Sequence, residues 1–415
     1  MNAGGAPVPA APAEVQAGGR THWPAVLAAA GAGVAIATQV GKVPPAIGAL
    51  RGELGLTLVQ AGWVSSTLTT LAVLLALAMG LVVGRFGALR MLLGGLVLGA
   101  AASMAATAIG AGPQAFAAML LARLVEGAGF LAVAVAAPAL VSAAAAPADR
   151  RFALAVWATY LPLGAGLAMA ASPLLLPATG WRGLWVMSAA ALLLAGVAVL
   201  LQRRHYGAGI GPASQRFGRS PGGGVLAVLR QPLPWLYGLA FALWAMQHYA
   251  LIIWMPSFLR EQRGLGPLAA ALLTAAMLLA CVPGNLLGGA LVQRGVPRGR
   301  LIASAHLVTG LCGWACFSDA LPDGLRFAAS VLLSFTGGLV PTAALSASAV
   351  LARGPRQISA VQGLVMQLAQ LGQFAGTPLI AAVVAAAGQW QSARWVTAGA
   401  AAAGVALGLW AWRQE

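Results

Sequence analysis

Twelve long apolar stretches, separated by short polar segments, follow one another along the chain. Each has about 20 residues or more, the length at which an α-helix crosses the hydrocarbon core of a bilayer. They form two groups of six, so the pattern predicts an all-α membrane protein with twelve transmembrane helices in two six-helix halves. The stretches lie near 23–48, 58–83, 90–111, 115–143, 153–176, 183–201, 233–257, 267–292, 301–318, 327–351, 358–386 and 394–412.

Two polar segments interrupt this pattern. Residues 202–232 are rich in Gly, Pro and Arg, and they predict a cytoplasmic linker between an N-terminal half, 21–201, and a C-terminal half, 233–415. Residues 1–20 are rich in Ala, Pro and Gly and lack the basic start and apolar run of a signal peptide. They predict a disordered, uncleaved cytoplasmic tail.

Composition excludes a soluble domain. Hydrophobic residues make up 60% of the 415 residues and charged residues 8%, against about 25% charged in soluble proteins, and the mean hydropathy is +0.86. The 24 basic residues exceed the 8 acidic ones, but they stand singly or in pairs between apolar runs, which argues against nucleic-acid binding. Cys281, Cys312 and Cys316 lie within apolar runs without CxxC spacing, so no disulfide framework, metal or cofactor is expected.

The basic residues also predict the orientation, because cytoplasmic loops of membrane proteins carry the excess of Lys and Arg. With the N-terminus inside, sixteen basic residues fall in cytoplasmic segments and six in outer loops, while Lys42 and Arg123 lie within spans. Both termini are therefore expected in the cytoplasm. Arg outnumbers Lys 23 to 1, which favours a GC-rich bacterial source and hence a multi-pass protein of the inner membrane.

The two halves share short motifs at one spacing. Leu50-Arg51-x-x-x-Gly55-Leu56 recurs at Leu259, and Gly80-x-x-Val83-x-Arg85 recurs at Gly289, both 209 positions later. The same shift carries the start of the first helix to the start of the seventh. Two parallel six-helix repeats are typical of a class of membrane folds that work by rocking of the halves.

The loop between helices 2 and 3 carries the first family resemblance. It reads Gly80-Leu-Val-Val-Gly84-Arg85-Phe-Gly87-Ala-Leu-Arg90 and resembles the G-x-L-a-D-R-x-G-R-R loop of the major facilitator superfamily. The resemblance implies a gating role for Gly80, Arg85, Arg90 and, in the second copy, Arg294. The family's Asp is replaced by Gly84 and Gln293, which puts the strength of that gate in question. The alternative is that Arg85 and Arg90 only mark the cytoplasmic side of the membrane, as basic loop residues commonly do.

Helix 4 contains Arg123-Leu-Val-Glu126-Gly127-Ala-Gly129, which resembles the superfamily's R-x-x-q-G-x-G motif with Glu in place of Gln. Arg123 and Glu126 share a helix face at i,i+3 and are expected to pair. They form either a gating or coupling pair or a structural pair that fixes helix packing. Glu126 is the only carboxylate placed deep within a span, so a carboxylate proton relay requires it.

Helix 1 contains Gln39-Val-Gly-Lys42-Val-Pro44-Pro45. The two prolines interrupt the helix at depth. Lys42 either snorkels to the outer interface or serves, beside Gln39, as a cavity cation for an anionic substrate. Lys42 and Arg123 less Glu126 leave one net positive charge within the bundle, which favours the anion hypothesis.

Helices 7 and 11 supply further polar candidates. Gln247, His248 and Tyr249 stand near the midplane, ahead of Trp254-Met-Pro256, in a pattern that resembles the cyanate permease/nitroimidazole-resistance branch of the superfamily. His248 is either a hydrogen-bonded interhelical residue or a proton carrier, and Trp254 is interpreted as an interface anchor. Gln367 and Gln370 share a face of helix 11, for substrate binding or for helix packing.

The resemblance covers residues 21–412 and implies a transporter rather than an enzyme, and no GxSxG, HExxH or Walker A pattern occurs. We expect a monomeric secondary transporter that moves a small anion or anionic organic solute with protons. Lys42, Gln39, Gln247, Tyr249, Gln367 and Gln370 would bind the substrate. A proton-antiporting exporter of drugs, siderophores or metabolites is the alternative. Helix 5 lacks a clean antiporter G-x-x-x-G-P-x-x-G-G motif, which lowers the weight of drug/proton antiport.

Overall fold

A computed structural model describes residues 20–146, 148–149, 153–154, 156–157, 159–206, 229–347, 351 and 355–415. Residues 1–19 of the predicted tail and 207–228 of the predicted linker lie outside the described residues. The described secondary structure is helical throughout.

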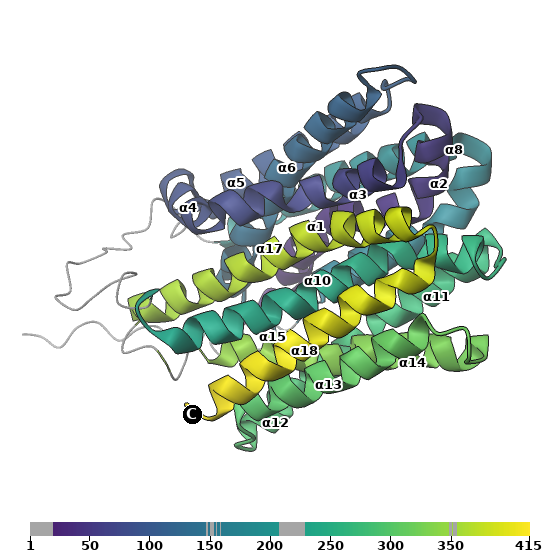
Figure 1. The fold of residues 1–415 in the computed structure, drawn as a ribbon. Coiled ribbons are helices and arrows are strands. Elements are labelled where there is room, and N and C mark those ends of the chain that lie inside the picture. Colours follow the sequence, from purple (N-terminus) through teal and green to yellow (C-terminus); the bar gives the residue numbers. More distant parts are fainter. Residues whose placement is uncertain are drawn as a thin grey trace, which may run out of the picture.

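Helices of the two halves occupy separate parts of the molecule (Figure 1). The N-terminal half contains α1 (Trp23–Gly41), α2 (Val43–Leu54), α3 (Leu58–Ser66), η1 (Thr67–Thr69), α4 (Thr70–Phe86), α5 (Ala88–Ala106), α6 (Ala115–Ala144), α8 (Tyr160–Leu201) and η2 (Arg203–Tyr206). The C-terminal half contains α10 (Pro232–Glu261), α11 (Pro267–Leu279), α12 (Cys281–Gln293), α13 (Arg298–Cys316), α14 (Asp323–Gly337), α15 (Leu339–Ser346), α17 (Pro355–Ala387), η4 (Trp390–Ser392) and α18 (Ala393–Trp412).

The predicted twelve crossings are confirmed. In the described part of the chain, ten helical spans are long and apolar enough to cross a membrane. One of them, α8, has 42 residues and non-helical torsion angles at Gly180 (φ 61°, ψ −164°). It therefore holds two crossings, since one needs only about 20 residues. The remaining crossing is α13, whose 19 residues include Arg298, Arg300 and His306 and are correspondingly less apolar.

Several crossings are broken where the sequence leads one to expect it. The first consists of α1 and α2, which meet at Lys42, just before Pro44 and Pro45. Proline has no amide hydrogen and displaces a carbonyl of the preceding turn, so this break exposes backbone groups in the middle of the bundle.

The turn from α4 to α5 passes through Gly87 at φ 89°, a conformation that favours glycine.

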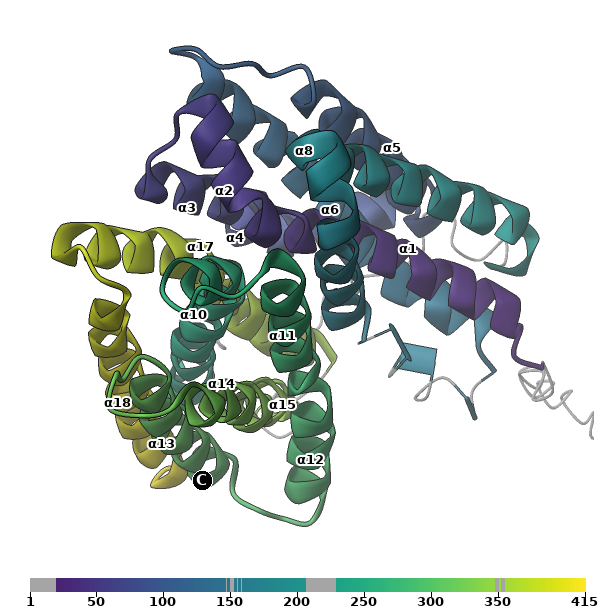
Figure 2. The ribbon, with the colours of Figure 1, turned by 90° about the vertical axis from the view of Figure 1, so that its right-hand side faces the viewer.

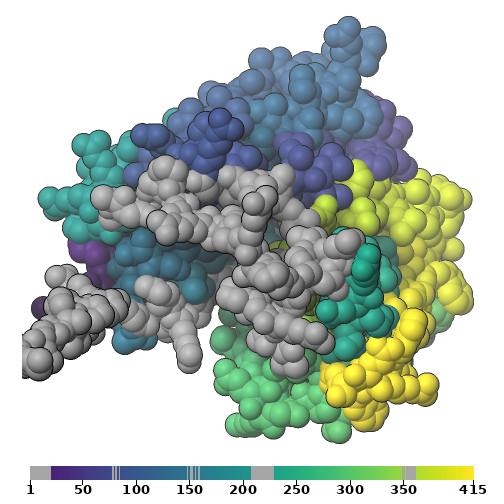
Figure 3. Space-filling view, turned by 90° about the vertical axis from the view of Figure 1, so that its left-hand side faces the viewer, coloured from purple at the N-terminus to yellow at the C-terminus, as the bar shows by residue number. Residues whose placement is uncertain are grey.

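Both described chain ends lie at one end of the bundle, on the left of Figure 1. We call this the terminal end; it holds Trp23 and Trp412. The other we call the opposite end, and Figure 2 looks onto it, with the N-terminal half above and the C-terminal half below. Figure 3 shows the terminal end, with helices of the N-terminal half above and those of the C-terminal half below.

The halves are joined mainly by three sets of contacts: α11 packs on α8, α17 on α3 and α4, and α10 on α2. One buried apolar cluster runs through the N-terminal half and into the opposite end of the C-terminal half, for example Leu50 with Leu259. Apolar residues at the terminal end of the C-terminal half form a separate cluster. Packing of the described residues thus closes the opposite end.

A contact between two histidines joins the start of α1 to η2, at the end of the N-terminal half. The rings of His22 and His205 stack with centroids 3.5 Å apart, and the Tyr206 hydroxyl donates to the Ala25 carbonyl at 3.0 Å. Desolvation, aided by the nearby charges of His22 and Arg204, lowers the pKa of His205. The lowered pKa favours the neutral form of the His205 ring in this stack.

We expect this fastening to loosen in acid. Because the pKa of His205 is lower in the folded than in the unfolded state, its contribution is complete above about 6.5, the ordinary histidine value, and is lost as pH falls through the lowered pKa. Hydrogen exchange of residues 22–26 should quicken on acidification. A His205→Phe variant keeps a ring to stack and should show no such change; equal acid sensitivity in both proteins would contradict this origin.

Candidate functional site

A cluster of polar side chains is buried in the middle of the N-terminal half. Its members come from three crossings and are at most 1% exposed: Gln39 and Lys42 at the break after α1, Ser103 on α5, and Arg123 and Glu126 on α6. Charged side chains in the interior of a membrane protein are costly and persist where they pair or serve function. This is the most strongly charged buried region among the described residues.

Glu126 is the centre of the cluster. Its Oε1 atom accepts from Lys42 Nζ at 2.7 Å and from Ser103 Oγ at 2.7 Å, and its Oε2 atom accepts from Arg123. Ser103 in turn accepts from Gln39 Nε2 at 2.8 Å and from Lys42 Nζ at 3.0 Å. The carboxylate is therefore shared between two cations.

Backbone groups complete the coordination of Arg123. Its Nε donates to the Val64 carbonyl at 3.1 Å, and its second terminal nitrogen donates to the Gln39 carbonyl at 3.0 Å. Lys42 Nζ also lies 4.3 Å from the centre of the Trp185 ring, a cation–π distance. Two cations and one carboxylate leave the cluster with one positive charge that no described side chain neutralises.

The predicted pairing of Arg123 with Glu126 is present. The snorkelling alternative for Lys42 is wrong, because its side chain is wholly buried and bonded to Glu126. Sequence reasoning treated Lys42 as a separate cation and missed this second ion pair, and it missed Ser103 altogether. The signal available was that Glu126 is the only deeply placed carboxylate, so two buried cations had one partner between them.

The polar residues of α10 point in different directions. Gln247 is buried and donates to the Leu243 carbonyl at 3.3 Å, but its Oε1 has no hydrogen-bond partner among the described residues. The buried Tyr249 hydroxyl likewise has none, and it lies within electrostatic range of Arg123. Unpaired buried polar atoms cost about 1–3 kcal/mol each. A bound solute would satisfy them.

His248 is directed into its own half. Its Nε2 lies 2.8 Å from Ser334 Oγ on α14, and its ring stacks on Trp244 with centroids 4.7 Å apart. The structure therefore contains the interhelical hydrogen bond that was one of the two interpretations. His248 is not among the side chains that contact Lys42 and Glu126.

On α17, Gln367 joins the halves, because its Nε2 donates to the Val73 carbonyl of α4 at 2.5 Å. Gln370, one turn later, is half-buried. Nearby, the Trp63 and Phe374 rings meet edge to face with centroids 5.5 Å apart. Gln367 therefore lies at the interface on which relative movement of the halves would act.

The loop residues with a predicted gating role lie apart from the buried cluster. Gly80 is within α4, and Arg85, Arg90 and Arg294 are exposed at the terminal end. Arg85 lies 5.8 Å from the Phe86 ring centre, and no ion pair to these arginines occurs among the described residues. Their gating role stays a prediction.

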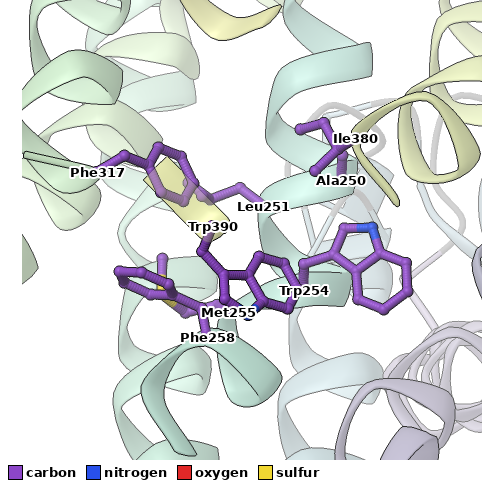
Figure 4. A pocket seen from close by; sticks show the side chains of 8 residues that line it. All are labelled: Ala250, Leu251, Trp254, Met255, Phe258, Phe317, Ile380 and Trp390. Atoms are coloured by element: carbon purple, nitrogen blue, oxygen red, sulfur yellow. The ribbon is translucent and has the colours of Figure 1, made fainter. Parts of the chain in front are cut away.

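Aromatic side chains fill the opposite end of the C-terminal half. Trp390 lies between Phe258 and Trp254 (Figure 4), and Trp254 Nε1 donates to the Thr377 carbonyl at 3.0 Å. The interpretation of Trp254 as an interface anchor is wrong, since its ring is buried in protein. Only about 10 Å³ remains between these rings, roughly the room one water needs, so the cluster is tightly packed.

Two six-helix halves, with a buried charged cluster in the N-terminal one, are the arrangement of a polytopic membrane protein of the transporter class. The family model described as Major Facilitator Superfamily matches residues 27–377. The chain belongs to this superfamily and is a membrane transporter for a small-molecule substrate rather than an enzyme.

Solved structures agree with this fold. The chain is similar to a bacterial homolog of the human lysosomal transporter Spinster in its inward-facing, unoccupied conformation, with a TM-score of 0.78 and 16% identity over 95% of this chain and 98% of that one. The inward-facing, occupied conformation matches with a TM-score of 0.75 and 15% identity over 94% and 96%. Identities this low show the fold alone. No curated protein matches the chain.

Proposed function

We propose that this chain is a monomeric secondary transporter that moves a small anion or anionic organic solute together with protons, by alternating access. Membership of the cyanate-permease-like branch is part of the proposal and rests on the α10 pattern of Gln247, Tyr249 and Trp254-Met-Pro256. A place in a bacterial inner membrane, with both termini in the cytoplasm, rests on the distribution of arginines.

The observation that carries the proposal is the uncompensated positive charge of the central cluster. Lys42 and Arg123 share one carboxylate, Glu126, and all three side chains are at most 1% exposed. A buried net charge is expensive unless a counter-ion reaches it. A transported anion would supply that counter-ion, and a cationic solute would meet repulsion.

Coupling to protons follows from competition for the two cations. A substrate anion and the Glu126 carboxylate both bind Lys42 and Arg123, so protonation of Glu126 frees the cations for the substrate. By thermodynamic linkage, anion binding then favours protonation of Glu126 by the same factor. His248 stays a second candidate proton carrier, although its bond to Ser334 ties it to helix packing.

The C-terminal half would complete the site with neutral hydrogen-bonding groups. Among the described residues no partner reaches the buried Gln247 Oε1 or the Tyr249 hydroxyl. On α17, Gln367 contacts α4 of the other half, and Gln370 lies one turn later. Binding sites in this class of fold lie near the midplane between the repeats. If cations of one half and amides of the other held the substrate, substrate binding would depend on the relative position of the two halves.

In the alternating-access proposal, the described conformation faces the terminal end. The opposite end is closed by packing and by an ion pair between the halves, Arg51 with Glu261 at 3.6 Å. If the terminal end is cytoplasmic, this is the inward-facing form. Arg85, Arg90 and Arg294 would then contribute to bracing the outward-facing form.

The test is electrical, with purified protein in proteoliposomes on a solid-supported membrane. Small anions should give currents, and Lys42→Ala should reduce them at least tenfold, because a charge-assisted contact contributes about 1.5–3 kcal/mol. Arg413→Ala, at the exposed end of α18, is the control and should behave as the wild type. Currents with cationic compounds alone would overturn the anion proposal and favour the exporter of drugs, siderophores or metabolites.

A further inference from the structure

The second crossing of the N-terminal half is interrupted without help from proline or glycine. Between α3 and α4, Thr67–Thr69 form the 3₁₀ turn η1, and Thr69 has φ −90° and ψ −5°, whereas a regular α-helix has about −63° and −42°. No proline or glycine lies within residues 63–79. A 3₁₀ stretch within a helix often marks a hinge, and the cause of this one lies in its contacts.

Hydroxyl side chains support the turn from within the crossing. Thr67 Oγ1 donates to the Trp63 carbonyl at 2.7 Å, and Thr69 Oγ1 donates to the Ser66 carbonyl at 2.9 Å. Bonds of this kind, from Ser and Thr to carbonyls of the preceding turn, often bend helices. The side chains of this stretch are therefore suited to a bend.

A contact from α6 holds the turn from outside. Arg123 Nε donates to the Val64 carbonyl at 3.1 Å, a carbonyl that in a regular α-helix accepts from the amide of Leu68, four residues later. A side chain inserted into this ladder of backbone bonds is a known cause of a kink. One turn further along α6, a Cβ atom on Gly127 would lie 2.3 Å from the Leu68 oxygen. Helix α6 thus meets the backbone both before the turn and within it.

The part of the crossing before the turn, α3, packs on α17 of the other half. The Trp63 and Phe374 rings meet edge to face with centroids 5.5 Å apart, and a Cβ atom on Gly62 would lie 3.1 Å from Pro378 Cα. This close approach belongs to the packing that closes the opposite end. The angle between α3 and α4 therefore determines whether α3 can stay on α17.

We propose that η1 is a hinge and that Arg123 is the positioning residue that holds it bent, with α3 packed on α17. When Arg123 leaves the Val64 carbonyl, that carbonyl returns to the Leu68 amide, the angle between α3 and α4 changes, and the contacts of α3 with α17 loosen. The inference rests on the proposed function, in which a substrate anion competes for the Arg123 guanidinium. It adds the second crossing to the path from the charged cluster to the interface between the halves.

The experiment measures the separation of α3 from α17 by pulsed electron paramagnetic resonance, with full-length protein in nanodiscs and with neither substrate nor proton gradient. Spin labels are placed at Leu58→Cys and Ala386→Cys, and the three native cysteines are buried. Arg123→Lys keeps the charge but lacks the planar set of donors of a guanidinium. It should raise the ratio of separated to packed populations at least tenfold, the effect of about 1.4 kcal/mol or more. Arg413→Lys, at the exposed end of α18, is the matched control and should keep the wild-type distribution.

Leu68→Pro tests the hinge itself, because proline lacks the amide hydrogen that the Val64 carbonyl would regain. Combined with Arg123→Lys, it should return the packed population to the wild-type level. Thr69→Val keeps the side-chain shape, removes the bond to Ser66 and lies outside the charged cluster. It should raise the separated population about threefold, and it decides the matter if Arg123→Lys fails to fold.

An unchanged distance distribution in Arg123→Lys or in Thr69→Val, or no recovery on addition of Leu68→Pro, would overturn the hinge. Because no substrate is present, this outcome does not depend on which solute is carried. The absence of anion currents would overturn the proposed function and leave the measured hinge in place, so the two proposals fail separately.

Discussion

A Glu126→Gln variant is expected to exchange anions across a proteoliposome membrane but to take up no protons with them. In the wild type the carboxylate bonds both Lys42 and Arg123, and the incoming anion must displace it. Glutamine keeps the shape and a hydrogen-bonding oxygen but carries no charge. The cations are then permanently free, so the substrate binds without a proton and the proton gradient no longer drives it.

The same substitution should strongly lower the stability of the folded protein when no anion is bound. Removal of one partner from a buried ion pair costs about 3–5 kcal/mol, because the remaining charge is left without compensation. Here two cations would remain in a cluster whose side chains are at most 1% exposed. Added anion should restore much of the loss, since ligand binding to the folded state stabilises it by mass action.

Three measurements check this result: proton uptake with an internal pH dye, anion counterflow, and the melting temperature with and without anion. Glu53→Gln is the control, because Glu53 pairs with Arg182 where the two side chains are 44% and 35% exposed, and exposed pairs contribute about 0–1 kcal/mol. Proton uptake at the wild-type ratio in Glu126→Gln would exclude Glu126 as the coupling group and would turn attention to His248.

The second large effect is expected when one methyl group is added to Gly41, next to the break between α1 and α2. A Cβ atom on Gly41 would overlap the backbone of Ala165 on α8, and backbone cannot move aside as a flexible side chain can. Small residues at such contacts let membrane helices approach closely. Gly41→Ala should therefore cost about 1–3 kcal/mol of stability, the usual range for overpacking, and lower the yield of folded protein.

Gly31→Ala is the matched control on the same helix. A Cβ at Gly31 would meet no atom within 4 Å, and alanine in a helix is about 0.5–1 kcal/mol more favourable than glycine. Its melting temperature should equal or exceed that of the wild type. If both variants melt alike, the close approach of α1 to α8 contributes nothing to stability.

Much of the fold follows from the sequence, because each crossing is specified locally by about 20 apolar residues. The break at Lys42 was also predictable, since Pro44 and Pro45 act on their own turn. The pairing of Arg123 with Glu126 follows from helix periodicity alone. These features depend on neighbours in the chain.

The missed features depend on contacts between distant segments. Lys42 and Glu126 are 84 positions apart, and Ser103 has no sequence motif that marks it as a ligand of that pair. Trp254 lies near the end of its crossing, as an interface anchor would. Its ring is instead covered by Trp390 and Thr377, which come from a distant part of the sequence.

The break between α1 and α2 gives the central charges a mechanical role. Arg123 holds the Gln39 carbonyl on one side of the break, and Lys42 at the break holds Glu126. Beyond the break, α2 carries Arg51, which reaches Glu261 in the other half. Under the proposed alternating-access mechanism, an exchange of partners at the cluster would change the bend of this crossing, and α2 would transmit that change to the interface between the halves.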